Sequence, residues 1–74
     1  MYTPAVEDYL KAIWILQQSE TPVATSRIAE RLELTAAAVT AMVKRLAEQG
    51  LLRHERYQGV RLTPAGELAA LRII

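Results

Sequence analysis

The chain has 74 residues, a formal net charge of +1 and no cysteine. This length allows one small domain with a modest core, and the lack of cysteine excludes disulfides and thiolate metal sites. No apolar run reaches the roughly 18 residues of a membrane span, and the N-terminus lacks a secretion signal. Residues 53–61 are basic and residues 1–20 acidic, which fits a modest phosphate-binding patch or ordinary solvated charge. We expect one cytoplasmic domain without membrane contact.

The first third of the sequence predicts two helices. Apolar residues at helical spacing predict a helix over residues 4–16, with Thr3 as its N-cap and a proline at its first position. After a turn and the short extended piece "PVAT", the segment "TSRIAERLEL" predicts a second helix over residues 25–34. Either Thr25 or Ser26 would cap it.

A third helix is predicted from Ala36 to Gln49, only a few residues after the second. Thr35 is its expected N-cap, and Gly50 is expected to end it in the left-handed conformation. Its core-facing residues follow helical spacing and are Val39, Met42, Val43 and Leu46. Two short helices joined by a tight turn indicate a helix-turn-helix unit.

A hairpin and a fourth helix complete the expected fold. "LLRHERY" and "VRLT" predict two short strands, and Gly59 supplies the positive φ of the turn between them. A hairpin directly after a helix-turn-helix is a wing. Thr63 and Pro64 then predict the start of a fourth helix that reaches the apolar Ile74 without a capping glycine. We expect the natural chain to continue beyond this point, with a frayed terminus as the alternative.

These elements define the predicted fold class. It is mainly α with a small β-hairpin, a winged helix-turn-helix over residues 1–74 with a three-helix core, a two-stranded wing and the start of a fourth helix.

The outward face of the third predicted helix is slim and ends in basic residues. Ala37, Ala41 and Lys44 lie almost opposite the apolar stripe, with Thr40 and Arg45 on its flanks. Such a face can enter the major groove, where alanine methyls contact thymine methyls and threonine hydroxyls bond to bases or phosphates. Alanine alone would indicate only a good helix former. The turn, the preceding helix and the wing together favour DNA recognition.

Two other segments are candidate DNA contacts. Thr25, Ser26 and Arg27 begin the helix that crosses the DNA backbone in a helix-turn-helix, so they could hold a phosphate. Helix capping with a solvated arginine is the alternative. The wing residues that could reach sugar–phosphate or a minor groove are Tyr57, Gln58, Gly59 and Arg61. A hairpin without contacts is the competing interpretation.

Catalysis and metal binding find little support in the residues themselves. His54 has no partner of triad type, so we expect no enzyme, and we interpret His54 as a strand residue half covered by packing. Trp14 is interpreted as a packing residue. Asp8 is interpreted as a solvated helix carboxylate, because no further oxygen ligands converge on it and Lys11, one turn later, would repel a cation.

The segments "EDYLKAIWIL", "IAERLELTAAAVTAMVKRLAEQGLL" and "GVRLTPAGELA" resemble the diphtheria toxin repressor family of metal-dependent bacterial repressors, and most closely its manganese transport regulators. The resemblance implies a DNA-binding domain followed by a dimerisation and metal-binding domain that is absent from this chain. It also implies a homodimer on palindromic double-stranded DNA. The positions that read DNA in relatives correspond to Thr35, Ala37, Thr40 and Ala41, and those that hold phosphate to Thr25, Ser26 and Arg45.

The same resemblance makes Asp8 a metal ligand. Aspartate at this position is manganese-like, so Mn²⁺ or Fe²⁺ is implied for the full-length protein and none for this fragment. Lys11 stands where manganese-type relatives often have glutamate, which puts a second metal ion in doubt. The resulting hypothesis is the DNA-binding domain of a metal-dependent repressor of metal homeostasis genes. The alternatives are a winged-helix module for protein–protein contact and a metal-independent regulator.

Overall fold

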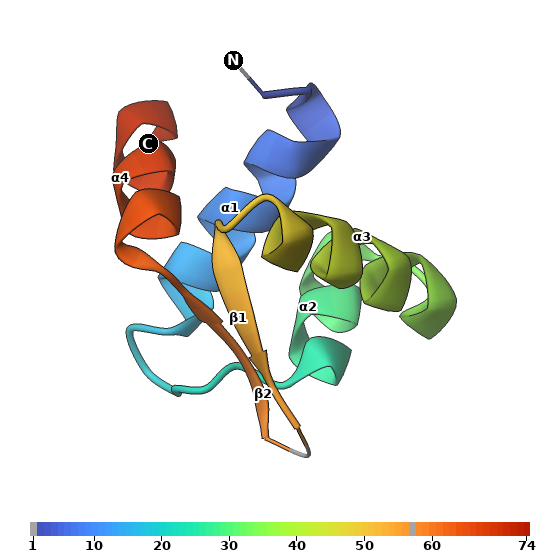
Figure 1. The fold of residues 1–74 in the computed structure, drawn as a ribbon. Helices are drawn as coiled ribbons and strands as arrows, with labels where there is room; N and C mark the ends of the chain where they lie inside the picture. The colour runs from blue at the N-terminus through green and yellow to red at the C-terminus, as the bar shows by residue number, and fades with distance from the viewer. Residues whose placement is uncertain (1, 57) are drawn as a thin grey trace.

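The computed structural model describes residues 2–56 and 58–74 and contains four helices and one hairpin within them (Figure 1). The elements in chain order are α1 (Pro4–Leu16), α2 (Thr25–Leu32), α3 (Ala36–Glu48), β1 (Leu52–Glu55), β2 (Gly59–Leu62) and α4 (Pro64–Ile73). The predicted winged helix-turn-helix is therefore confirmed.

The caps explain where three of the helices begin. The Thr3 hydroxyl accepts the Val6 N–H at 3.2 Å at the start of α1, and the Thr35 hydroxyl accepts the Ala38 N–H at 3.1 Å at the start of α3. Thr63 caps α4 in the same way. Each of these caps is confirmed as predicted, because a threonine hydroxyl reaches an N–H three residues later within one local turn.

The predicted cap of α2 is wrong. Ala24 is the residue before the helix, no side chain caps it, and Thr25 is already the first helical residue. The cause is tertiary, because Val23 and Val60 exchange backbone hydrogen bonds of 2.8 Å in both directions. This bridge holds the chain extended as far as Ala24, and the helix begins immediately afterwards.

A tight turn joins α2 to α3. Glu33 adopts the left-handed conformation at φ 56° and ends α2, and the Leu34 N–H bonds back to the Ala29 carbonyl at 3.0 Å. Two residues later α3 is under way, so the helix-turn-helix has the short connection that was predicted. At its other end α3 stops at Glu48, one residue earlier than predicted, and Gly50 follows in the left-handed conformation at φ 78°.

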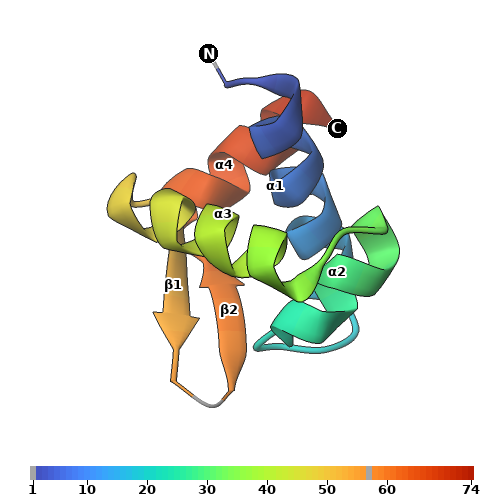
Figure 2. The same ribbon diagram turned by 90° about the vertical axis from the view of Figure 1, so that its right-hand side faces the viewer.

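The wing is anchored to the start of α2. β1 and β2 pair antiparallel, with His54 opposite Val60. β1 is shorter than its predicted segment, and β2 begins and ends one residue before the predicted "VRLT". The Val23–Val60 bridge gives β2 a second, short partner on its other edge. Gly59 is required there, because its φ is 130° and a Cβ on it would lie 2.2 Å from the Val23 carbonyl oxygen. Figure 2 shows the wing extending from the helical body beside α3.

The core lies where α1, α2 and α3 meet the base of the wing. Its largest fully buried side chains are Leu10, Ile13, Ile28, Leu46, Val23, Val39, Val43 and Val60. Trp14 packs against this core while partly exposed, which confirms its predicted packing role. Among the helices described, none combines the length and apolar character needed to cross a membrane.

Candidate nucleic-acid interface

One row of exposed residues runs along the outward face of α3. Ala37, Ala41, Lys44 and Glu48 follow one another at intervals of four, three and four residues, so they share one side of the helix. All four are exposed, whereas the opposite side of the helix buries Val39, Val43 and Leu46 in the core. The small side chains occupy the N-terminal half of the row and the charged ones the C-terminal half. The face is therefore slim where it would enter a groove.

The two basic residues of α3 take no part in the ion pairs of the described residues. Lys44 and Arg45 are exposed, and neither forms an ion pair with a carboxylate in residues 2–56 and 58–74. Thr40 on the flank is exposed as well. Positive charge without an internal partner is free to meet a phosphate, which is the arrangement expected at a backbone contact.

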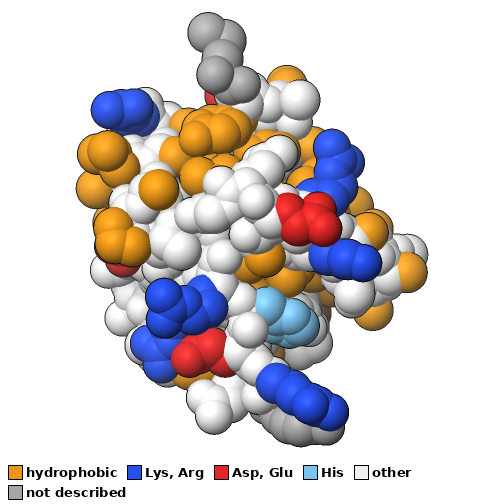
Figure 3. All heavy atoms as spheres, in the orientation of Figure 1, with side chains coloured by type: hydrophobic (Ala, Val, Ile, Leu, Met, Phe, Trp, Pro, Cys, Tyr) orange, Lys and Arg blue, Asp and Glu red, His pale blue; other side chains and the backbone are white. Residues whose placement is uncertain are grey.

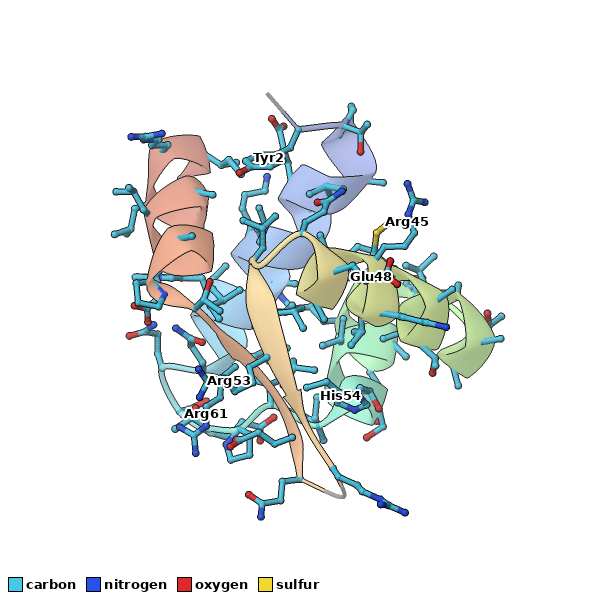
Figure 4. The ribbon with its side chains drawn as sticks, in the orientation of Figure 1. Tyr2, Arg45, Glu48, Arg53, His54 and Arg61 are labelled. Atoms are coloured by element: carbon cyan, nitrogen blue, oxygen red, sulfur yellow. The ribbon has the colours of Figure 1, made fainter. Side chains whose placement is uncertain are left out.

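Sequence reasoning missed Glu48, which stands in the same outward row. Figure 4 shows Arg45 and Glu48 projecting from the C-terminal half of α3. A carboxylate on this face repels phosphate, but it can accept a hydrogen bond from the amino group of cytosine. The sequence could have predicted this position, because Glu48 follows Lys44 by four residues and residues four apart share a helix face.

The start of α2 lies beside the wing, and the hydroxyls of Thr25 and Ser26 there do not cap the helix. No side chain of residues 2–56 and 58–74 caps it with a hydrogen bond. Arg27 is different, because its guanidinium lies 3.3 Å from a Glu20 carboxylate oxygen and 3.7 Å from a Glu30 one. A phosphate at Arg27 would have to compete with two carboxylates. The threonine and the serine are the better placed of the three predicted contacts.

The two faces of the wing differ in charge. Strand alternation puts Arg53 and Glu55 of β1 on one face together with Arg61 of β2, which pairs with Glu55. Arg61 lies opposite Arg53 in the register, so it sits within the strand and not at the tip where it was predicted. In Figure 4 both arginines lie on the side of the hairpin away from α3. The predicted contact Gln58 is exposed near the tip, and Tyr57 lies outside the described residues.

His54 occupies the other face of the wing and is exposed, so the prediction that packing half covers it is wrong. The reason is its position at the outer edge of the hairpin. Its cross-strand partner Val60 is fully buried, whereas His54 borders an open hollow beside the start of α2 and stays exposed. In Figure 3 the imidazole of the chain's one histidine lies in the notch between α3 and the wing tip, with Lys and Arg side chains above and below it.

The residues around Asp8 do not make a metal centre by themselves. Asp8 is well exposed on α1, and the Lys11 ammonium approaches its carboxylate at 4.0 Å. The hollow beside them also receives Arg31, so one carboxylate faces two cations. In the described part of the chain no group of three or more metal-ligating side chains converges. A divalent cation binds several oxygen ligands, so the described residues around Asp8 do not fit one.

A slim helix face, a preceding helix that packs against it and an adjoining wing together define a winged helix-turn-helix DNA-binding domain. The comparisons identify the family. The model of the iron dependent repressor N-terminal DNA binding domain matches residues 1–60, and the chain belongs to this family. The family is one of transcriptional regulators, not of enzymes.

Similar proteins confirm the resemblance seen in the sequence. The HTH-type transcriptional regulator MntR of Lysinibacillus sphaericus is 38% identical over 74 residues, which are the whole of this chain and 53% of that protein. MntR of Shouchella clausii is 39% identical over the whole chain and 52% of its own length. The solved structure of the manganese regulator SloR matches 93% of this chain and 32% of its own, with a TM-score of 0.74 and 36% identity. The chain thus spans about half the length of the curated relatives it matches.

Proposed function

We propose that this chain is the DNA-binding domain of a manganese-responsive transcriptional repressor, which acts in the cytoplasm as a homodimer on a palindromic operator. The observation that carries the proposal is the outward row of α3, where exposed alanines are followed by a lysine that has no carboxylate partner among the described residues. The names of the relatives support a role in transcription.

In this proposal α3 lies in the major groove with Ala37 and Ala41 close to the base edges. Lys44 and Arg45 contact phosphates along the edge of the groove. The Thr35 hydroxyl can donate a hydrogen bond to a further phosphate, because the capping bond from the Ala38 N–H uses only its oxygen as an acceptor. The start of α2 and the wing follow the backbone on either side. Two copies related by a twofold axis would place their α3 helices in successive major grooves, about 34 Å apart.

The regulatory half of the proposal rests on the relatives and not on the described residues. SloR is a manganese regulator, whereas the family takes its name from iron, which is the alternative metal. Because Asp8 is one carboxylate beside Lys11, we assign most metal ligands and the dimer interface to a further domain beyond residue 74. Such a domain accords with the share of the relatives that this chain leaves unmatched.

Selection from a pool of random DNA duplexes tests both halves of the proposal. The full-length protein would be incubated with the pool in Mn²⁺, in Fe²⁺ under reducing conditions, and with a chelator. We expect one palindromic sequence to be enriched with Mn²⁺ and little enrichment with the chelator. Equal enrichment with the chelator would show a metal-independent regulator. No enrichment under any condition, with the protein folded, would leave the protein–protein module as the better account.

A further inference from the structure

His54 is turned toward the proposed DNA and not toward the face of the wing that carries Arg53, Glu55 and Arg61. Residues alternate along β1, so Leu52 and His54 share the face that meets the protein body, while Arg53 and Glu55 share the other face. Figure 4 shows His54 projecting from β1 toward α2 and α3, opposite to the arginines of the wing. The imidazole therefore lies on the side of the molecule that carries α3.

The notch around His54 is polar, open and free of carboxylates at its walls. A hollow of about 270 Å³ is bounded by His54, by Ala24 and Thr25 at the start of α2, and by Gln58 and Gly59 at the start of β2. The charged residues on the surrounding elements are Arg27, Glu30 and Arg31 of α2, Lys44, Arg45 and Glu48 of α3, and Arg53, Glu55, Arg56 and Arg61 of the wing.

Most of the nearby carboxylates are already engaged or face elsewhere. Glu55 pairs with Arg61 on the opposite face of the wing, and Glu20 before α2 and Glu30 within it both pair with Arg27. Glu48 projects from α3 and does not line the hollow. His54 forms no ion pair within residues 2–56 and 58–74. Within the described residues, no carboxylate is placed to accept a hydrogen bond from the His54 imidazolium, so an anion from outside the chain can do so.

We infer that His54 is a further DNA contact, which donates to a backbone phosphate lying in the notch between α3 and the wing and binds it more strongly when the imidazole is protonated. This inference rests on the proposed DNA-binding function and adds one residue and a pH dependence to it. Histidine is the side chain whose charge ordinarily changes between pH 5 and 8. The protonated ring has two N–H donors, and its positive charge displaces a counterion from the phosphate.

The test compares salt dependence at two pH values. Affinity for a fluorescent duplex would be measured by anisotropy between 50 and 200 mM salt, at pH 5.5 and pH 8.0. One added phosphate contact steepens the logarithmic salt slope by about 0.9. We therefore expect the slope of the wild-type protein to be about 0.9 steeper at pH 5.5. His54→Gln should keep the shallower slope at both values, and His54→Arg should keep the steeper one.

Two controls make the outcome decisive. The α-amino group also titrates in this range, and His54→Gln retains it, so an unchanged pH effect in that variant would overturn the inference. Equal slopes in the wild-type protein would overturn it too. Circular dichroism at both pH values confirms that each variant is folded, as expected for an exposed site. Failure of DNA binding at pH 8.0 in the wild-type protein would instead count against the proposed function.

Discussion

Replacing Lys44 with alanine should weaken DNA binding by a predictable, salt-dependent amount. Lys44 is exposed in the outward row of α3 and has no carboxylate partner among the described residues, so its whole charge is available to one phosphate. One such contact contributes about 0.9 to the logarithmic salt slope. A fourfold rise in salt therefore weakens the wild-type protein about 3.5-fold more than the variant.

Arg72→Ala is the matched control, because it removes the same charge from an exposed residue of α4, on the part of the molecule away from α3 (Figure 1). Titration of a duplex by anisotropy from 50 to 200 mM salt gives the slope for each protein. Arg72→Ala should retain the wild-type slope. Retention of that slope by Lys44→Ala, or an equal loss in both variants, would refute the assignment of Lys44 to a phosphate.

Three further outcomes are expected. Gly59→Ala should lower the free energy of unfolding in urea by about 2–4 kcal/mol, because its Cβ would meet the Val23 carbonyl. Gly50 also has a positive φ, but a Cβ there would enter open space, so Gly50→Ala should lower the free energy of unfolding by only about 1–2 kcal/mol. Equal losses in the two variants would contradict this. Glu48→Gln should raise affinity for non-specific DNA about twofold by removing a repelling charge, measured by anisotropy; lower affinity would indicate that the carboxylate contacts a base. Burial raises the pKa of Tyr9 above its ordinary value of 10.0. The protonated phenol therefore contributes its full stability below pH 10.0, and this contribution is lost as pH rises through the folded-state pKa. The melting temperature of Tyr9→Phe should fall less steeply above pH 10.0 than that of the wild-type protein, and parallel curves would contradict this.

Local signals in the sequence predicted most of the fold. Thr3, Thr35 and Thr63 each cap a helix through a hydrogen bond to an N–H three residues later, so their role depends only on neighbours in the chain. The cap of α2 was mispredicted because a contact distant in sequence, the Val23–Val60 bridge, holds the chain extended up to Ala24. No periodicity in the chain indicates such a bridge.

The interface was only partly predictable for the same reason. Helical spacing correctly assigned Ala37, Ala41 and Lys44 to one exposed face. The same spacing also places Glu48 on that face, although it was not predicted there. Strand alternation could assign His54 to a face of the wing, but whether a neighbouring element covers that edge depends on how the wing packs. The pairing of Arg27 with Glu20 likewise joins a helix to the preceding loop, which neither segment indicates alone.

The central claim is that α3 turns its slim side toward a DNA groove. The most direct test is a map of backbone amide chemical shifts in the ¹⁵N-labelled chain as a duplex is added. We predict the largest changes at Ala37, Ala41 and Lys44, with smaller ones around Ser26 and little change along the exposed face of α4. Changes concentrated on α1 and α4, with the outward row of α3 unaffected, would contradict the claim.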